Sequence, residues 1–165
     1  MWKIEGDEFQ YENTVTIDAP VEVVYRTVSR VDDYDLFLSD VAVAEMEGDS
    51  ICHMVVRAGP LRIGVRTRVT YTENKKVDFV MVEGPPVERL GGSWETVARP
   101  DGGGTDVTFR ANIKAGRAGK WLLQTASRYV ERKATSLIEA FRVQINKNLS
   151  QTGARTDVQP HDSHG

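Results

Sequence analysis

Alternating hydrophobic and polar residues fill the middle of the chain and predict a series of β-strands. Between residues 61 and 72 the odd-numbered side chains are mostly apolar, while the even-numbered ones include Arg62, Arg66 and Arg68. This two-residue period is that of a strand with one buried face. The same pattern, broken by turn residues, predicts strands over Val41–Glu47, Ser50–Ala58, Leu61–Thr72, Val77–Glu83, Leu90–Arg99 and Thr105–Lys114. The short turns between consecutive strands favour an antiparallel sheet.

The residues before this region predict one further strand and two short helices. Thr14–Asp18 alternates like a strand and ends at Ala19–Pro20, where proline suits the first turn of a helix. The following helix has an apolar side within Val23–Val28. Asp32 can cap a second short helix that extends to Phe37. We therefore expect an α+β fold with a sheet of about seven strands.

The last regular element is a long amphipathic helix, predicted from Ala118 to Leu149. No glycine or proline follows Gly119 within this segment. Its apolar residues recur at three- and four-residue steps and form one stripe. The stripe consists of Leu122, Ala126, Tyr129, Val130, Ala134, Leu137, Phe141, Ile145 and Leu149. A helix of this kind that lies across a curved sheet can enclose an apolar cavity.

The face of the sheet that meets this helix is nearly free of ionisable groups. Each strand places apolar residues on one side, and Glu83, at a strand end, is the main exception. General acid–base catalysis needs a titratable group within hydrogen-bond reach of the substrate. The inner face offers few such groups, and the polar candidates are Tyr71, Glu83, Thr96 and Tyr129. His53 falls on the opposite, outer face.

Length and charge exclude several classes of protein. With 165 residues and a formal charge of −3, the chain suits one domain and has no general attraction to nucleic acid. We expect a single ligand-binding domain over residues 1–150 and a disordered polar tail over 151–165. The first residues lack the apolar stretch of a signal peptide, so we expect a cytoplasmic location. A single cysteine, Cys52, excludes an intrachain disulfide, and no spacing typical of a metal or cofactor site occurs.

Cationic residues gather on the predicted outer face of the sheet. They are Arg57, Arg62, Arg66, Arg68, Arg89, Arg99, Arg110 and Lys114. Such a face can make transient contact with an acidic protein or with anionic lipid. Because Asp78, Glu95 and Asp106 are interleaved with these cations, we favour a solvated face without a partner.

Three motifs give the chain a resemblance to a known superfamily. Ile17–Tyr25 resembles the entry motif of the START/polyketide-cyclase (SRPBCC) superfamily, and residues 12–150 follow the order of elements of that superfamily. Asp32–Leu38 is similar to the coenzyme Q-binding branch, with Asp35 in a region where that branch usually has a proline. Ala58–Ile63 and the glycine-led closing helix are similar to the branch that resembles a carbon monoxide dehydrogenase subunit.

The resemblance implies a helix-grip fold, in which a curved antiparallel sheet wraps around the long helix with a hydrophobic cavity between them. Methionine and aromatic side chains adapt well to the shape of a ligand. The residues that we predict to line the cavity are Met54, Val56, Ile63, Val65, Phe79, Met81, Trp94, Phe109, Tyr129 and Phe141. The sequence identifies no catalytic residue, metal or cofactor.

Three functional classes remain. The first is binding or transport of a hydrophobic small molecule, such as a lipid, a quinone or a polyketide-like aromatic, and the apolar inner face favours it. The second is an enzyme of the polyketide cyclase or dehydratase type, in which orientation within the cavity does most of the work. The third is an accessory protein for redox-enzyme assembly, which acts through its surface and is expected to have a filled interior and an exposed apolar patch.

Overall fold

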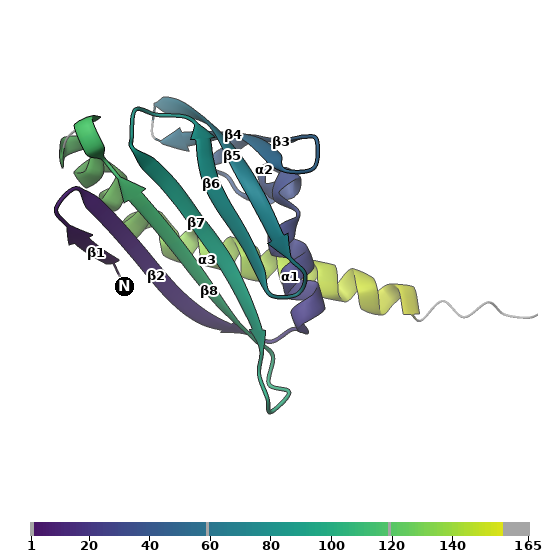
Figure 1. Cartoon of the computed structure of the whole chain (residues 1–165). Helices are drawn as coiled ribbons and strands as arrows, with labels where there is room; N and C mark the ends of the chain where they lie inside the picture. The colour runs from purple at the N-terminus through teal and green to yellow at the C-terminus, as the bar shows by residue number, and fades with distance from the viewer. Residues whose placement is uncertain (1, 59, 119, 157–165) are drawn as a thin grey trace, which may run out of the picture.

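A curved antiparallel sheet is the main element of the structure, a computed structural model that describes residues 2–58, 60–118 and 120–156. The described residues form an eight-stranded sheet in the order β1-β2-β8-β7-β6-β5-β4-β3 (Figure 1). The strands are β1 (Trp2–Glu5), β2 (Glu8–Ile17), β3 (Val41–Glu47), β4 (Ile51–Ala58), β5 (Leu61–Thr72), β6 (Lys76–Glu83), β7 (Arg89–Ala98) and β8 (Thr105–Lys114). The predicted α+β class is confirmed, and the strands from Val41 onward agree with the prediction to within a residue at each end.

The N-terminal hairpin differs from the prediction. β2 begins at Glu8 instead of Thr14, and β1 precedes it across a tight turn in which Glu5 pairs with Glu8. Gly6 adopts a positive φ of 58° in this turn, a conformation that glycine reaches without steric cost. The side chains of β1 are all exposed, so this edge strand lacks the buried alternation from which the other strands were predicted.

Three α-helices and two short 3₁₀ turns complete the fold of the described residues. They are α1 (Val21–Ser29), η1 (Val31–Asp33), α2 (Tyr34–Phe37), η2 (Gly116–Ala118) and α3 (Lys120–Thr156). α3 extends past the predicted end at Leu149 into the segment for which we expected a tail, and residues 157–165 lie outside the described residues. Gly153 costs a helix only about 1 kcal/mol, and no proline occurs in this part of the chain before Pro160. Within the described residues, no helix combines the length and apolar character that a membrane crossing requires.

The long helix α3 lies across one face of the sheet and packs against it at two places (Figure 1). Towards its C-terminal end, Phe141 and Ile145 join a core cluster with residues of α1, α2 and the sheet. Nearer its N-terminal end, Leu123 and Ala134 join a second cluster with β2 and β8. The side chains of Leu122, Ala126 and Ala58 lie outside the described part of the chain or at its edge, and no contact is assigned to them. Contact at two places leaves room for a cavity between the helix and the sheet.

A β-bulge in β6 reverses the predicted orientation of Glu83. Thr67 pairs with Met81 but Arg66 pairs with Glu83, so β6 carries one extra residue between the two pairs. Beyond the bulge the side chains change face. Glu83 therefore lies on the outer face, where its carboxylate accepts a hydrogen bond from Arg66 at 3.0 Å. The expectation that Glu83 lies on the inner face is wrong, because strict alternation fails at a bulge.

Candidate ligand-binding cavity

A cavity of about 390 Å³ lies between α3 and the inner face of the sheet. Its walls come from α2, the loop that leads into β3, strands β4 to β8, and the middle of α3. Eight of the residues predicted from the sequence line it, namely Met54, Val56, Val65, Phe79, Trp94, Phe109, Tyr129 and Phe141. The structure thus brings these residues together from several elements, and their contact with a ligand stays a prediction.

Ile63 and Met81 are not among the described residues that line the cavity. Ile63 pairs with Val56 close to the β4–β5 turn, at the end of the strand beyond the cavity. Met81 lies just before the bulge, and its sulfur occupies the space where a Cβ on Gly84 would stand. Both side chains belong to inner-face positions, but the wall of the cavity ends before it reaches them.

An aromatic cluster forms one wall of the cavity. The Trp94 ring centroid lies 4.6 Å from that of Phe109 and 4.6 Å from that of Phe141. Phe141 also meets Tyr34 and Phe37 edge to face, at centroid distances of 5.2 and 5.1 Å. Trp94 is 4% exposed and Phe141 is 1% exposed. Rings that are packed on several sides in this way form a rigid apolar wall.

Gly92 leaves the neighbouring wall without a side chain. It stands opposite Phe79 on one side and Ala111 on the other, at a position that faces the cavity. A Cβ built at Gly92 would lie 2.5 Å from the carbonyl oxygen of Arg110. Because no side chain fits there without a backbone shift, this part of the cavity stays open.

Tyr34 brings a hydroxyl to the aromatic wall, and that hydroxyl is already used. It donates a hydrogen bond to the backbone carbonyl of Val28. Burial raises the pKa of Tyr34 well above its ordinary value. A phenol that keeps its proton and already donates it to the backbone is a poor general acid or base.

Asp40, Tyr129 and Lys133 form a polar group at one side of the cavity, which we call the mouth cluster. The Lys133 Nζ lies 3.3 Å from Asp40 Oδ2, and this ion pair joins α3 to the loop before β3. The Tyr129 hydroxyl donates a hydrogen bond of 3.2 Å to the carbonyl of Arg57 in β4. Burial, followed by the charge and hydrogen bonding of Asp40, raises the pKa of Tyr129 to about 12. All three residues of the mouth cluster line the cavity.

Sequence reasoning identified Tyr129 but missed Asp40 and Lys133. Lys133 stands between Tyr129 and Leu137 at four-residue steps, so the helical period places it on the stripe that faces the cavity. The sequence search selected apolar residues and passed over this cation. Asp40 belongs to the turn before β3, and its sequence neighbours carry no signal for its contact with α3.

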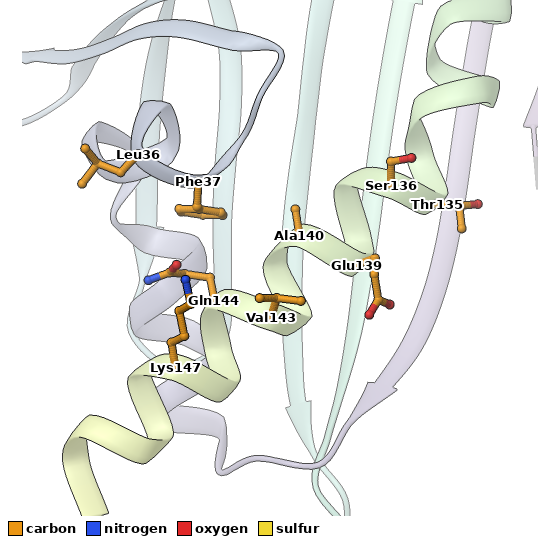
Figure 2. A pocket seen from close by; sticks show the side chains of 9 residues that line it. All are labelled: Leu36, Phe37, Thr135, Ser136, Glu139, Ala140, Val143, Gln144 and Lys147. Atoms are coloured by element: carbon orange, nitrogen blue, oxygen red, sulfur yellow. The ribbon is translucent and has the colours of Figure 1, made fainter. Parts of the chain in front are cut away.

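A larger hollow of about 620 Å³ lies on the other side of α3, between that helix and α2 (Figure 2). Figure 2 shows Leu36 and Phe37 on α2 and the remaining lining residues along α3. Most of its α3 side chains are polar, including Thr135, Glu139 and Lys147. The smaller cavity under α3 has apolar and aromatic walls, so it is the better site for an apolar ligand despite its smaller volume.

The cations of the outer sheet face are largely paired with acids. Arg66 contacts Glu47 at 2.6 Å and Glu83 at 3.0 Å. Arg110 contacts Glu12 at 2.9 Å and Glu95 at 2.7 Å. Arg99 and Lys114 also have acidic partners, and His53 lies beside this network in register with Arg66. These pairs favour the solvated face over a basic docking patch.

Comparison with solved structures identifies the same fold in other proteins. The Zhui aromatase/cyclase from Streptomyces sp. R1128 superposes with a TM-score of 0.74 at 18% identity, covering 86% of this chain and 96% of that one. A protein from Thermus thermophilus gives 0.70 at 20% identity over 84% and 97% of the two chains. A START superfamily protein from Mycobacterium smegmatis gives 0.66 at 16% identity over 84% and 97%. These similarities establish a shared helix-grip fold.

Sequence comparison gives the family. No curated protein matches the chain. The family model described as polyketide cyclase / dehydrase and lipid transport matches residues 17–142, a range that includes the mouth cluster and the aromatic wall. The chain therefore belongs to the polyketide cyclase/dehydrase and lipid transport family.

Proposed function

We propose that this protein binds a compact apolar molecule, with a flat ring system, in the cavity between α3 and the sheet. The observation that carries the proposal is the rigid wall formed by Trp94, Phe109 and Phe141, which stands beside an open space at Gly92. Flat aromatic surfaces that face an empty space favour the stacking of a planar ligand.

The size of the cavity limits the ligand. A volume of about 390 Å³ lies towards the low end of the range of small-molecule sites. It suits a few fused rings, such as a quinone or a polyketide-like aromatic, better than a long acyl chain. Burial of about 200 Å² of apolar ligand surface contributes about 5 kcal/mol, before the cost of immobilising the ligand and the gain from ring stacking. We therefore expect affinities no tighter than the micromolar range.

A second candidate is catalysis of the cyclase or dehydrase type. The fold is shared with an aromatase/cyclase, and the mouth cluster provides an acid and an amine at the edge of the cavity. In that case Asp40 and Lys133 are the groups that can move a proton, since the Tyr34 hydroxyl is bonded to Val28. Conversion of a poly-β-ketone to an aromatic product, lost in Asp40→Asn, would favour the enzyme over the binder.

Binding is tested by native mass spectrometry of the freshly purified protein, followed by calorimetric titration with naphthalene. We expect a co-purifying apolar molecule or, after its extraction, saturable binding of one naphthalene. Ala111→Leu narrows the cavity beside Gly92 and is expected to weaken binding at least about tenfold. Ala98→Leu changes an exposed alanine and serves as the matched control. An absence of naphthalene binding, or equal binding by both variants, would overturn the proposal.

A further inference from the structure

The mouth cluster is the charged part of an otherwise apolar lining. Among the described residues that line the cavity, Asp40 and Lys133 are the ones that carry a formal charge. The two charges lie 3.3 Å apart and oppose each other, and both side chains are partly exposed, as the mouth of a cavity requires. The cavity therefore presents hydrogen-bonding groups to a ligand with almost no net charge.

We propose that the mouth cluster selects ligands by their head group, accepting a neutral hydroxyl or carbonyl and rejecting a carboxylate, with Asp40 as the residue that sets this selection. The inference rests on the proposed function, because it concerns the polar end of a molecule whose apolar body occupies the same cavity.

Hydrogen-bonding capacity supports a neutral head group. The Lys133 ammonium has three donors, so it can contact Asp40 and still donate to a carbonyl or hydroxyl oxygen. Asp40 has two acceptor oxygens and can receive the proton of a ligand hydroxyl. Ser136, which also lines the cavity, adds a hydroxyl that can donate or accept. A phenol, alcohol or ketone would find partners for all of its polar atoms.

Electrostatics disfavours a carboxylate. An anionic head group at the mouth would be attracted by Lys133 and repelled to a similar degree by Asp40, because the two charges lie so close together. It would still lose part of its hydration on entering the apolar cavity. Removal of the Asp40 charge leaves the attraction of Lys133 unopposed.

Tyr129 contributes position and a fixed protonation state. Its hydroxyl is held between the Arg57 carbonyl and Asp40, and its raised pKa of about 12 keeps it protonated at neutral pH. It therefore adds no charge to the mouth. The hydrogen bond also joins α3 to β4, which holds Lys133, one turn further along the helix, opposite Asp40.

The test compares three probes with the same ring system, naphthalene, 2-naphthol and 2-naphthoate, by calorimetric titration of the full chain at neutral pH. We expect 2-naphthol to bind more tightly than 2-naphthoate. In Asp40→Asn, the ratio of 2-naphthoate to 2-naphthol affinity is expected to rise at least about tenfold, which corresponds to about 1.4 kcal/mol. In Lys133→Met the same ratio is expected to fall. Glu139→Gln removes an acid from α3 outside the cavity and is expected to leave the ratio unchanged.

The outcomes separate this inference from the proposed function. If naphthalene binds but Asp40→Asn and Lys133→Met leave the ratio unchanged, the selection by head group is overturned and the proposed function stands. If no probe binds the unmodified protein, the proposed function fails and the inference fails with it. Naphthalene affinity in each variant shows that its cavity is intact, and Lys133→Met tests the inference independently if Asp40→Asn does not fold.

Discussion

Trp94 in β7 and Phe141 in α3 place their ring centroids 4.6 Å apart, and this contact ties the helix to the sheet at one end of the cavity. Phe141 also contacts Tyr34 and Phe37 of α2, so one side chain joins three elements of the fold. The aromatic wall that is proposed to receive a ligand is therefore also part of the folding core.

Phe141→Ala is expected to destabilise the protein by about 3 to 5 kcal/mol. The side chain is 1% exposed, and its removal leaves a hole among aromatic rings that can relax only in part. Urea unfolding followed by circular dichroism measures the change. Val143→Ala, at a position that is 48% exposed on the same helix, is the control and is expected to change stability by less than about 0.5 kcal/mol. Equal effects of the two variants would contradict the packing of Phe141.

Tyr34→Phe is expected to cost about 1 to 3 kcal/mol of stability. The substitution removes the donor to the Val28 carbonyl and leaves that acceptor without its partner in a buried place. Chemical denaturation of the two proteins measures the difference. Tyr71→Phe removes the hydroxyl of a tyrosine that is 41% exposed and is expected to have a smaller effect. A neutral Tyr34→Phe substitution would show that the hydrogen bond to Val28 contributes no net stability.

The Cys52 thiol is expected to be unreactive in the folded protein. It is 1% exposed, and burial raises its pKa to about 11, so little of the reactive thiolate is present at neutral pH. Reaction with Ellman's reagent at mildly alkaline pH is expected to be at least about tenfold slower in buffer than in denaturing urea. Rapid labelling in buffer would mean that β4 opens readily at Cys52.

Stability is expected to fall as pH rises from about 10 to about 12, in part through Tyr129. Its pKa rises from 10.0 to about 12 on folding, so the folded protein holds the phenolic proton more tightly than the unfolded chain does. The resulting stabilisation is complete below the unfolded pKa and is lost as pH rises through the folded pKa. Urea unfolding at several alkaline pH values measures the slope, which is expected to be shallower in Tyr129→Phe. An unchanged slope would show that Tyr129 is not linked to folding.

The sequence was sufficient for most of the fold because the alternation of apolar and polar residues is strong in β5, β7 and β8. It was insufficient where a local feature breaks the period. β1 is short and exposed, and the bulge at Val82 moves Glu83 to the other face of the sheet. In each case, pairing with a neighbouring strand decides the outcome, and one strand read alone carries no record of that pairing.

For the cavity, the sequence predicted the apolar wall better than the polar mouth. Phe79 and Trp94 follow from the period of their strands, whereas the contact between Asp40 and Lys133 joins a turn to a helix far along the chain. A search for apolar residues also excludes a lysine on principle. The helical step from Tyr129 to Lys133 was the available signal, and it becomes informative once polar residues on an apolar stripe are considered.

The absence of a side chain at Gly92 has a consequence for how such a pocket can change. A larger residue there would meet the Arg110 carbonyl, and a smaller residue in place of Phe141 would cost stability, so the deep end resists alteration in both directions. The rim formed by Asp40 and Lys133 is partly exposed and tolerates new side chains at lower cost. Preference for one compound over another can therefore shift at the entrance, while the interior keeps the shape of the molecules that it admits.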